Sequence, residues 1–344
     1  MKILVTGGLG YIGSHTVVEL LNQNYQVVIV DNLSNTSLDV LDGIYQIANV
    51  KPDFELLDLR NKSDVEFLFK KYDGFDGVIH FAASKAVGES VANPLHYYEN
   101  NINSLVYLLQ EVLKNPNTAF IFSSSCTVYG QSIELPITEK APFQTALSPY
   151  GNTKQIGEEI IEDVVKSCGL NAILLRYFNP IGAHHSGLIG ELPLGIPQNL
   201  VPYITQTALG IRTELAVFGN DYNTADGTCV RDYIHVVDLA KAHVISLVRL
   251  LNQKNVTPLE VFNLGTGNGH SVLELIHTFQ VVTGVNIPYK FVDRRAGDVE
   301  SAYADTQKAT DILGWKANLT LADALKSAWL WEQNHTSKKL ANTK

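Results

Sequence analysis

Short apolar runs alternate with stretches of helical periodicity through the first half of the chain. The apolar runs predict six β-strands, and the stretches between them, such as Ile12–Leu21, predict helices. Strands that are separated by helices pair in parallel through right-handed crossovers. The pattern therefore predicts an α/β fold with a doubly wound parallel sheet. The six predicted strands are Lys2–Val5, Gln26–Val30, Asp53–Leu57, Gly77–Phe81, Ala119–Phe122 and Leu170–Leu175.

From about Asn179 the pattern changes, because the chain becomes richer in Gly, Pro and Asn. Asn179–Gly182 and Leu192–Pro197 show this composition most clearly. Such segments are typical of loops and short elements, so we do not expect the alternation of strands and helices to continue. The sequence predicts a sheet domain over residues 1–178, to which some later segments return, and a smaller, interleaved C-terminal domain over residues 179–344.

The composition is that of a globular chain and argues against two classes of partner. Hydrophobic residues make up 45% and charged residues 18% of the 344 residues, and the formal net charge is −9. An acidic chain is poorly suited to nucleic acid or to an anionic membrane surface, since both repel it. We expect neither partner, although the balance leaves room for a local basic pocket around a small phosphorylated ligand.

Cysteine usage and the lack of targeting signals predict a cytoplasmic protein. Cys126, Cys168 and Cys229 lie far apart and form no CxxC pair, so we expect no disulfide framework and a reducing compartment. The apolar run at the N-terminus is too short for a signal-peptide core. No run of about 18 apolar residues predicts a transmembrane helix.

A glycine-rich loop joins the first predicted strand to the first predicted helix. Gly7, Gly10 and Gly13 follow the spacing G-x-x-G-x-x-G. A turn of this kind lets backbone N–H groups and the helix N-terminus face a pyrophosphate, which side chains at these positions would block. Turns alone also favour glycine, but the place between strand and helix favours dinucleotide binding.

Two carboxylates follow the next two strands. Asp31 ends the second strand, where a carboxylate can accept hydrogen bonds from both ribose hydroxyls of an adenosine and would repel a 2′-phosphate. This favours NAD over NADP, and the alternative is a turn Asp before Asn32. Asp58 follows the third strand and either reaches the adenine edge or starts a helix.

Tyr150 and Lys154 are four residues apart in a predicted helix that runs to Val165, so they share one helix face. A tyrosine ordinarily titrates near pH 10 and is a poor base at neutral pH. A nearby ammonium and the positive charge of an oxidised nicotinamide would favour the phenolate and lower that pKa. The pair therefore predicts a proton acceptor for hydride transfer.

A hydroxyl-rich run, Ser123–Thr127, follows the fifth predicted strand. Ligands of doubly wound sheets bind at the carboxyl ends of the strands, so Ser125 could hold a sugar hydroxyl there. The alternative is an ordinary serine-rich turn that ends the strand.

Taken together, the glycine loop, the Ser125 region and the Tyr150/Lys154 pair resemble the extended short-chain dehydrogenase/reductase superfamily, whose fold is the Rossmann type. Longer segments are similar to the UDP-glucose 4-epimerase family, and the resemblance covers the chain from Lys2 to about Trp331. These segments are Thr6–His15, Lys85–Ser90, Leu175–Pro180, Phe218–Tyr222 and Val230–His235.

The resemblance implies an isomerase that interconverts UDP-glucose and UDP-galactose with permanently bound NAD, through a transient 4-ketose. Tyr150 as phenolate would take the proton of the sugar 4-hydroxyl, Lys154 would lower the Tyr150 pKa and hold the nicotinamide ribose, and Ser125 would hydrogen-bond the 4-hydroxyl. Beside the loop glycines, the implied NAD contacts are Tyr11, Ile12, Asp31, Asn32, Asp58, Leu59, Phe81, Ala82, Lys85, Asn100 and Phe178.

The resemblance also implies a site for the nucleotide sugar. A diphosphate needs cations, and arginine can bind it in a bidentate manner. Arg231 and Arg295 match the family's pattern for that role, whereas we expect Arg294 to form a surface ion pair. The further implied contacts are Asn179 with the diphosphate or sugar, Asn199 with the uridine, and Asp298 with the uridine ribose.

Ala302 is the residue at which this chain departs from many family members. The position lies beside the sugar 2-position, and many members carry a bulky Tyr there. Members with a small residue also accept N-acetylated sugars, because an acetamido group needs space. The resemblance therefore implies that UDP-GlcNAc and UDP-GalNAc are substrates too, and that the neighbouring Cys126 only fills space.

Two other functions stay open as alternatives. A nucleotide-sugar 4,6-dehydratase needs an acid/base pair, which that family usually places after the fifth strand, where this chain has Ser125–Thr127. A non-catalytic NAD-sensing regulator typically loses the Tyr or the Lys. We expect no metal, because His184 and His185 lack ligand spacing, and we expect His80 to be a core residue. The resemblance implies a homodimer, with the helices about Leu95–Leu113 and Tyr150–Val165 as candidate interface.

Overall fold

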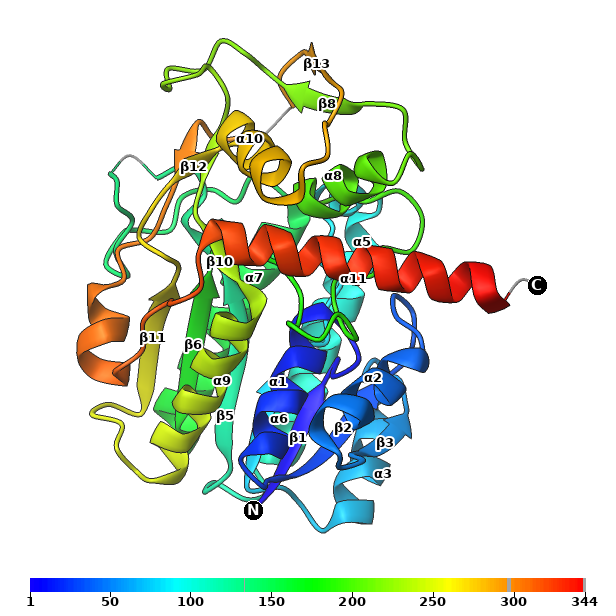
Figure 1. Cartoon of the computed structure of the whole chain (residues 1–344). Coiled ribbons are helices and arrows are strands. Elements are labelled where there is room, and N and C mark those ends of the chain that lie inside the picture. Colours follow the sequence, from blue (N-terminus) through cyan, green and yellow to red (C-terminus); the bar gives the residue numbers. More distant parts are fainter. Residues whose placement is uncertain (133, 296–297, 343–344) are drawn as a thin grey trace.

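Seven parallel strands form the central sheet of the computed structural model, which describes residues 1–132, 134–295 and 298–342, with side chains to residue 338 (Figure 1). The spatial order is β11-β6-β5-β4-β1-β2-β3. The order reverses between β1 and β4, which is the switch point where doubly wound sheets bind ligands. The strands are β1 (Lys2–Thr6), β2 (Gln26–Asp31), β3 (Asp53–Leu56), β4 (Gly77–His80), β5 (Ala119–Ser125), β6 (Ala172–Tyr177) and β11 (Leu259–Leu264).

The fold class and all six predicted strands are confirmed, and their ends agree within three residues. The seventh strand, β11, comes from far along the chain and pairs in parallel with β6, from Leu259 opposite Ala172 to Leu264 opposite Tyr177. Part of the chain beyond residue 179 thus belongs to the central sheet. The division into domains at residues 178 and 179 stays a prediction.

Helices cover both faces of the sheet because successive strand residues point to opposite faces. Ile3 and Val5 of β1 pack with α1 (Tyr11–Asn22), α2 (Asp39–Ala48) and α9 (Val236–Leu251). Leu4, between them, packs into a second cluster with α3 (Lys62–Tyr72), α6 (Ser104–Val112) and α7 (Pro149–Cys168). The remaining helices near this face are α4 (Val87–Ala92), α5 (Pro94–Tyr98) and a π-helical turn, Glu99–Asn103, that leads into α6.

His80 at the end of β4 is a core residue, as predicted. Its ring is 2% exposed, Nδ1 lies 2.8 Å from the Thr6 hydroxyl, and the ring stacks against Phe122. Burial lowers the pKa of His80 to about 3, and the nearby Lys154 adds to this shift. The imidazole is therefore neutral at physiological pH.

Among the described residues, three small sheets and three further α-helices lie beyond the carboxyl ends of the central strands (Figure 1). Their common core includes Ile204, Leu215, Phe279 and Leu325. The small sheets pair β7 (Asn179–Ile181) with β10 (Tyr233–His235), β8 (Leu215–Phe218) with β13 (Tyr289–Val292), and β9 (Val230–Arg231) with β12 (His270–Ser271) and β14 (Ser301–Ala302). The helices are α8 (Leu200–Ala208), α10 (Val272–Thr283) and α11 (Leu321–Asn342).

The expectation of loops and short elements after Asn179 is wrong for much of this half. The order β10, α9, β11 continues the alternation of strand and helix, and α9 alone has 16 residues. The apolar residues of Val236–Leu251 recur at helical spacing and pack on the sheet, a signal that the glycine- and proline-rich neighbours obscured. Across the described residues, no helix combines the length and apolarity that a membrane span requires.

Candidate active site

The glycine loop forms a tight turn between β1 and α1, in which two of the glycines are required by space. Gly7 has φ +65°, and a Cβ there would lie 2.9 Å from the Ala82 nitrogen. A Cβ on Gly13 would lie 2.3 Å from the Gly7 carbonyl oxygen. Gly10 is the N-cap of α1 and offers no side-chain cap. The first N–H groups of α1 therefore have no capping side chain in their way, which is the arrangement that a pyrophosphate requires.

Asp31 lies at the end of β2, directly beside this loop. Its side chain accepts hydrogen bonds from the backbone N–H of Leu9, at 3.2 Å, and of Leu33, at 3.0 Å. Burial raises the pKa of Asp31, and the backbone hydrogen bonds partly offset the rise. The turn interpretation and the cofactor interpretation are thus compatible, since one carboxylate closes a local turn and also faces the loop.

Asp58 does not start a helix, because α3 begins at Lys62 with Asn61 as its N-cap. Its carboxylate lies 2.6 Å from the Arg60 guanidinium and 3.4 Å from the Asn32 side-chain nitrogen. The hydrogen bond from Arg60 is the main reason why the pKa of Asp58 is lowered. The structure therefore brings Asp58 and Asn32 together, and the neighbouring Leu59 packs into the core at 6% exposure.

Tyr150 and Lys154 lie on one face of α7, in its first two turns. The helix starts where the Ser148 hydroxyl accepts from the Gly151 N–H at 3.1 Å, with Pro149 in the first turn. Lys154 Nζ donates to the Ser123 carbonyl at 2.8 Å and lies 5.9 Å from the centroid of the Tyr150 ring. Both side chains are less than a tenth exposed, so the pair is shielded from water.

Burial is the main cause of the pKa shifts of Tyr150 and Lys154. It raises the pKa of Tyr150 well above the ordinary value, with a contribution from Tyr177, while a hydrogen bond with Ser125 acts in the opposite direction. Burial also lowers the pKa of Lys154 to about 8. The expected lowering of the Tyr150 pKa by Lys154 is therefore not a property of the protein alone, because desolvation of the phenolate outweighs the ammonium.

The three serines at the end of β5 have three different partners. The Ser123 and Tyr177 hydroxyls are hydrogen-bonded to each other, and the Ser124 hydroxyl donates to Glu158. Ser125 accepts from the Thr127 N–H at 3.2 Å and also bonds Tyr150. Ser125 is thus the serine of the run that lies beside the Tyr150 hydroxyl.

A buried ion pair behind α7 was not predicted from the sequence. Glu158 and Arg176 lie 2.5 Å apart, with side chains 4% and 7% exposed, and Glu158 also receives the Ser124 hydroxyl. Burial of a pair is tolerated only with further hydrogen bonds, which Ser124 and Tyr129 supply here. Glu158 lies four residues after Lys154 on α7, but no local pattern indicates its pairing with Arg176, which is 18 residues away on β6.

One implied cofactor residue, Lys85, contacts a carboxylate that we did not predict, Glu191, and a second, Tyr11, is affected by its charge. The Tyr11 hydroxyl donates to the Gly182 carbonyl at 2.6 Å, and Lys85 Nζ lies 3.2 Å from Glu191. Asn199, an implied uridine contact, donates to the same Glu191 oxygen at 2.5 Å. Burial raises the pKa of Tyr11, and the Glu191 carboxylate adds to the rise.

The other implied cofactor residues line the carboxyl ends of β1, β4 and β6. The Ala82 N–H donates to the Thr6 hydroxyl at 3.2 Å, and the Phe81 ring lies against His243. Asn100 in the π-helical turn donates to the Ser84 hydroxyl at 3.0 Å. Ile12 packs on the core of the first face, and Phe178 is 3% exposed.

Three of the implied substrate residues, Arg231, Asp298 and Ala302, come together around β9, whereas Asn199 bonds Glu191. Arg231 lies 3.4 Å from Asp298, and β14 places Ala302 opposite Arg231 in a parallel pair. The Asp298 N–H donates to the Arg295 carbonyl at 3.2 Å. Arg231 therefore pairs with Asp298, whereas its chain neighbour Asp232 is fully buried and accepts from backbone N–H groups.

The adjacent residues Arg294 and Arg295 have different partners. The Arg294 guanidinium forms an exposed ion pair with Asp221 at 2.7 Å, so the surface-pair prediction for Arg294 is confirmed. The Arg295 guanidinium lies 4.8 Å from the centroid of the Phe218 ring. The backbone N–H of Asn179 donates to the carbonyl of Asp232, the residue after Arg231, at 2.9 Å.

Ala302 packs in a small cluster that also holds Cys126 and Phe178. Because Cys126 follows Ser125 directly, the cluster places Ala302 near the serine that bonds Tyr150. Burial raises the pKa of the Cys126 thiol to about 12, which fits a space-filling residue rather than a nucleophile. Among the described residues, no group of three or more His, Cys, Asp or Glu side chains could hold a metal ion.

Comparison with known proteins gives the family. The family model described as GDP-mannose 4,6 dehydratase matches residues 4–328. The UDP-glucose 4-epimerase of Bacillus subtilis is 48% identical over 98% of both chains. That of Dictyostelium discoideum is 49% identical, over 96% of this chain and 95% of its own.

Solved structures agree with these relatives. The UDP-glucose 4-epimerase of Stenotrophomonas maltophila, with bound NAD and formylated UDP-arabinopyranose, superposes with a TM-score of 0.94 at 46% identity, covering 98% of this chain and 99% of that one. The enzyme of Bifidobacterium longum, in complex with NAD+ and UDP, gives 0.92 at 46% identity, with the same coverage. The chain therefore belongs to the UDP-glucose 4-epimerase family of the extended short-chain dehydrogenase/reductase superfamily.

Proposed function

We propose that the chain catalyses the NAD-dependent C4 epimerisation of UDP-hexoses, in particular UDP-glucose and UDP-galactose, through a transient 4-ketose. The observation that carries this proposal is the gathering of Tyr150, Lys154 and Ser125 at the carboxyl ends of the parallel strands. Relatives named UDP-glucose 4-epimerase, near half identical over almost the whole chain, support it.

The residues of the β1–α1 turn fit an NAD molecule. The glycine turn exposes the N-terminus of α1, and the Asp31 carboxylate lies beside it for the adenosine ribose. Tyr11, Lys85 and Asn100 surround the same region. When bound, oxidised NAD would accept a hydride from the sugar C4 and would bring a positive charge to the Tyr150 region.

Tyr150 would hold and move the proton of the sugar 4-hydroxyl. Its phenol is buried, and the interaction with the Ser125 hydroxyl favours the phenolate, so Ser125 would share the proton transfer. In the protein alone this phenol stays protonated, and a cation beside it is needed before it can act as a base. Lys154, held by the Ser123 carbonyl, supplies one such charge from 5.9 Å away from the ring centroid.

Arg231 and Arg295 would bind the diphosphate of the nucleotide sugar. Arg231 is held between Asp298 and the Val230 carbonyl, and Arg295 stacks on Phe218. Two guanidinium groups presented from neighbouring segments suit a diphosphate, since each can bind in a bidentate manner. Asp298 would accept from the ribose, and Asn179 and Asn199 would complete the site.

Dehydration is the alternative that the name of the matching family model raises. A 4,6-dehydratase needs an acid and a base near C5 and C6, and this chain has Ser125, Cys126 and Thr127 in the place where that family usually carries carboxylates. The Cys126 thiol is protonated at neutral pH, because burial raises its pKa to about 12. The epimerase is therefore the better supported function.

The product distinguishes the two reactions. We expect the purified protein to convert UDP-galactose into UDP-glucose until both are present, with no other sugar in the proton NMR spectrum. Formation of a 4-keto-6-deoxy sugar would overturn the epimerase in favour of the dehydratase.

We further propose that UDP-GlcNAc and UDP-GalNAc are substrates. Ala302 packs with Cys126 and Phe178 beside the Ser125 region, and its methyl group leaves room for an acetamido group at the sugar C2. A structural neighbour from Campylobacter jejuni, at 35% identity, is described as a UDP-Glc/GlcNAc 4-epimerase.

Enlarging residue 302 tests this specificity. The Ala302→Tyr variant should lose at least about tenfold in kcat/KM for UDP-GalNAc and less than about threefold for UDP-galactose, because only the acetamido group competes with the ring. The two rates are measured in parallel with the parent. A parent that converts UDP-galactose but shows no turnover of UDP-GalNAc would contradict the proposal.

We also propose that the protein is a cytoplasmic homodimer. All three cysteines are free thiols, as a reducing compartment requires. The candidate dimer helices, α5 to α6 and α7, lie together on one face, and Leu95 at the start of α5 is 81% exposed. An exposed leucine of this kind is typical of a surface that a partner covers.

A further inference from the structure

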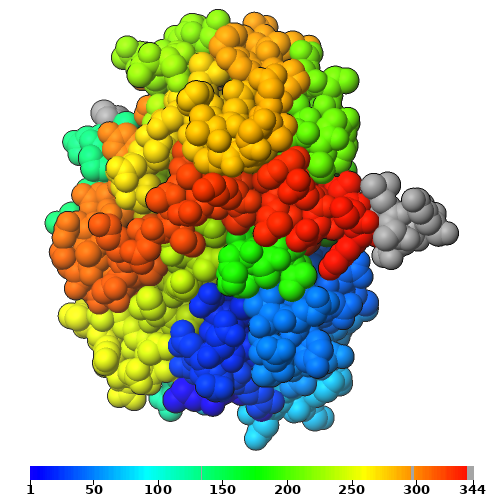
Figure 2. All heavy atoms as spheres, in the orientation of Figure 1, coloured from blue at the N-terminus to red at the C-terminus, as the bar shows by residue number. Residues whose placement is uncertain are grey.

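Glu191 lies where the cofactor side and the nucleotide-sugar side of the site meet. It follows a short antiparallel bridge between Ala183 and Gly190, in the segment that connects β7 to α8. Figure 2 shows this segment, in green, between α11 and the blue N-terminal elements. Its contacts with α2 are close, since a Cβ on Gly43 would lie 2.7 Å from the Leu188 carbonyl oxygen.

One oxygen of Glu191 receives a donor from each ligand site. Lys85 Nζ, from the implied NAD site, lies 3.2 Å from Oε1, and Asn199 Nδ2, from the implied uridine site, lies 2.5 Å from the same atom. The Glu191 side chain is 13% exposed, whereas that of Lys85 is 50% exposed. The Glu191 carboxylate is thus the more buried of these groups, and it orients the exposed side chains of Lys85 and Asn199.

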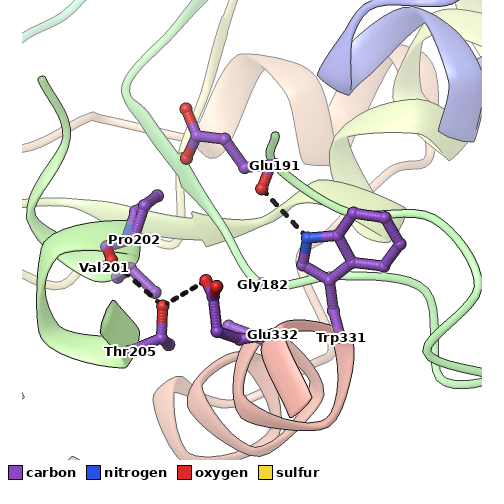
Figure 3. Close-up of a pocket in the computed structure, with 8 residues that line it drawn as sticks. Gly182, Glu191, Val201, Pro202, Thr205, Trp331 and Glu332 are labelled. Carbon is purple, nitrogen blue, oxygen red and sulfur yellow. Dashed lines mark hydrogen bonds between the residues drawn. The ribbon is translucent and has the colours of Figure 1, made fainter. Parts of the chain in front are cut away.

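Contacts with α11 fix the backbone of Glu191. The Trp331 indole of α11 donates to the Glu191 carbonyl at 3.0 Å, and a Cβ on Gly190 would lie 2.4 Å from the Trp331 ring (Figure 3). Behind the backbone, a cavity of about 10 Å³ separates Glu191 from the bonded pair Thr205 and Glu332. In Figure 3 the Glu191 carboxylate points away from that pair.

The negative charge of Glu191 bears on its role, because the ligands on both sides of it are negatively charged. NAD and a UDP-sugar both carry a negatively charged diphosphate, so a carboxylate near them repels both ligands. A carboxylate at this place therefore weakens the binding of both ligands unless it orients groups that the ligands use. We propose that Glu191 is a positioning residue that joins the two ligand sites, with its carboxylate setting Lys85 for NAD and Asn199 for the uridine. This rests on the proposed function.

Two substitutions separate position from charge. Glu191→Gln keeps the length and loses the charge, whereas Glu191→Asp keeps the charge and loses one methylene of reach. The matched control is Glu214→Gln, which removes the partner of Lys290 from an exposed ion pair. Three readouts apply: NAD retained after dialysis, the Kd of UDP by calorimetry, and kcat and KM for UDP-galactose.

We expect both Glu191 variants to bind UDP about three- to tenfold more weakly, with a matching rise in KM, and to lose NAD about threefold faster, while kcat stays within about twofold. The control should match the parent in each readout. Tighter or unchanged binding in Glu191→Gln would show a purely electrostatic residue and overturn the proposal, as would weakening of only one ligand. The two binding readouts need no turnover, so an inactive parent would refute the proposed function without deciding this question.

Discussion

At the residue scale, the site rests on polar side chains whose charged forms are penalised by burial. The Tyr150 phenol and the Lys154 ammonium lie on one helix face, and burial makes each favour its neutral form. Ser125, Ser123 and Tyr177 surround them with hydroxyls rather than with carboxylates. In the protein alone this site keeps the phenol protonated even with Lys154 beside it, so the basicity of Tyr150 would depend on the further positive charge that bound NAD would bring.

Removal of one hydroxyl tests the role of Tyr150. The Tyr150→Phe variant should lose about 10²- to 10⁴-fold in kcat, which is the range for general acid–base catalysis. Its thermal midpoint should stay within a few degrees of the parent, because the ring and its packing remain. Tyr289→Phe is the control, since the Tyr289 side chain is 42% exposed and lies on β13. Activity of Tyr150→Phe above a tenth of the parent value would contradict the assignment.

Buried neutral histidines predict an acid-sensitive fold. Burial lowers the pKa of His15 and of His80 to about 3 and that of His243 to about 4, and each is close to 6.5 when unfolded. The unfolded chain thus binds more protons below about pH 6.5, so stability is full above that pH and falls as the pH drops. Each histidine therefore costs on the order of 1 kcal/mol of stability at pH 5.5.

Urea unfolding at pH 7.5 and pH 5.5 measures this loss. We expect the free energy of unfolding to fall by about 3 to 4 kcal/mol between the two pH values. A His243→Leu variant should show a loss smaller by about 1 kcal/mol, whatever its own stability at pH 7.5. Equal stability of the parent at both pH values would contradict the neutral histidine core.

At the element scale, the start of α7 decides where the reactive side chains lie. The Ser148 cap and Pro149 fix the first turn, and Tyr150 is in that turn. Lys154 follows one turn later and reaches back to the end of β5. One helix start and one strand end therefore define the geometry of Tyr150, Lys154 and Ser125.

Loss of the cap should affect both stability and activity. Ser148→Ala removes the hydrogen bond to the Gly151 N–H and should cost about 0.5 to 2 kcal/mol of stability. Because the first turn then frays, we also expect kcat to fall several-fold. Ser167→Ala, at the exposed end of the same helix, is the control and should change neither value. A stable, fully active Ser148→Ala variant would show that packing alone sets the turn.

At the scale of the whole molecule, the carboxyl ends of the central strands face the smaller sheets and α11. The cofactor residues come from the β1 to β4 side, whereas Arg231, Asp298 and Ala302 come from the small sheet of β9, β12 and β14. α11 crosses between the two parts (Figure 2) and bonds the segment after β7 through Ser327 and Trp331.

The oligomeric state is the prediction that belongs to this scale. Sedimentation equilibrium at micromolar concentration should give twice the mass of one chain. Leu95→Arg places a charge on the exposed start of α5 and should shift the mass toward that of a monomer. Val256→Arg, on an equally exposed loop residue away from these helices, should leave the mass unchanged. A monomeric parent would contradict the homodimer.

The sequence allowed prediction where the signal is local. Strand runs, the glycine turn and the Tyr150/Lys154 spacing each lie within a few residues, and the structure has these elements in place. The long-range features were out of reach: β11 pairs with β6 across 87 residues, and Glu191 contacts Lys85 across 106. The burial that raises the pKa of Tyr150 in the protein alone was also out of reach, because the spacing shows only the neighbouring ammonium.

The most direct test of the account is a coupled epimerase assay on the purified protein with UDP-galactose and no added NAD. The account predicts formation of UDP-glucose together with close to one NAD per chain released on denaturation, because the cofactor undergoes no net change and need not leave. No turnover, even with NAD added, would contradict the epimerase and return the dehydratase or the NAD-sensing regulator as the function to be tested.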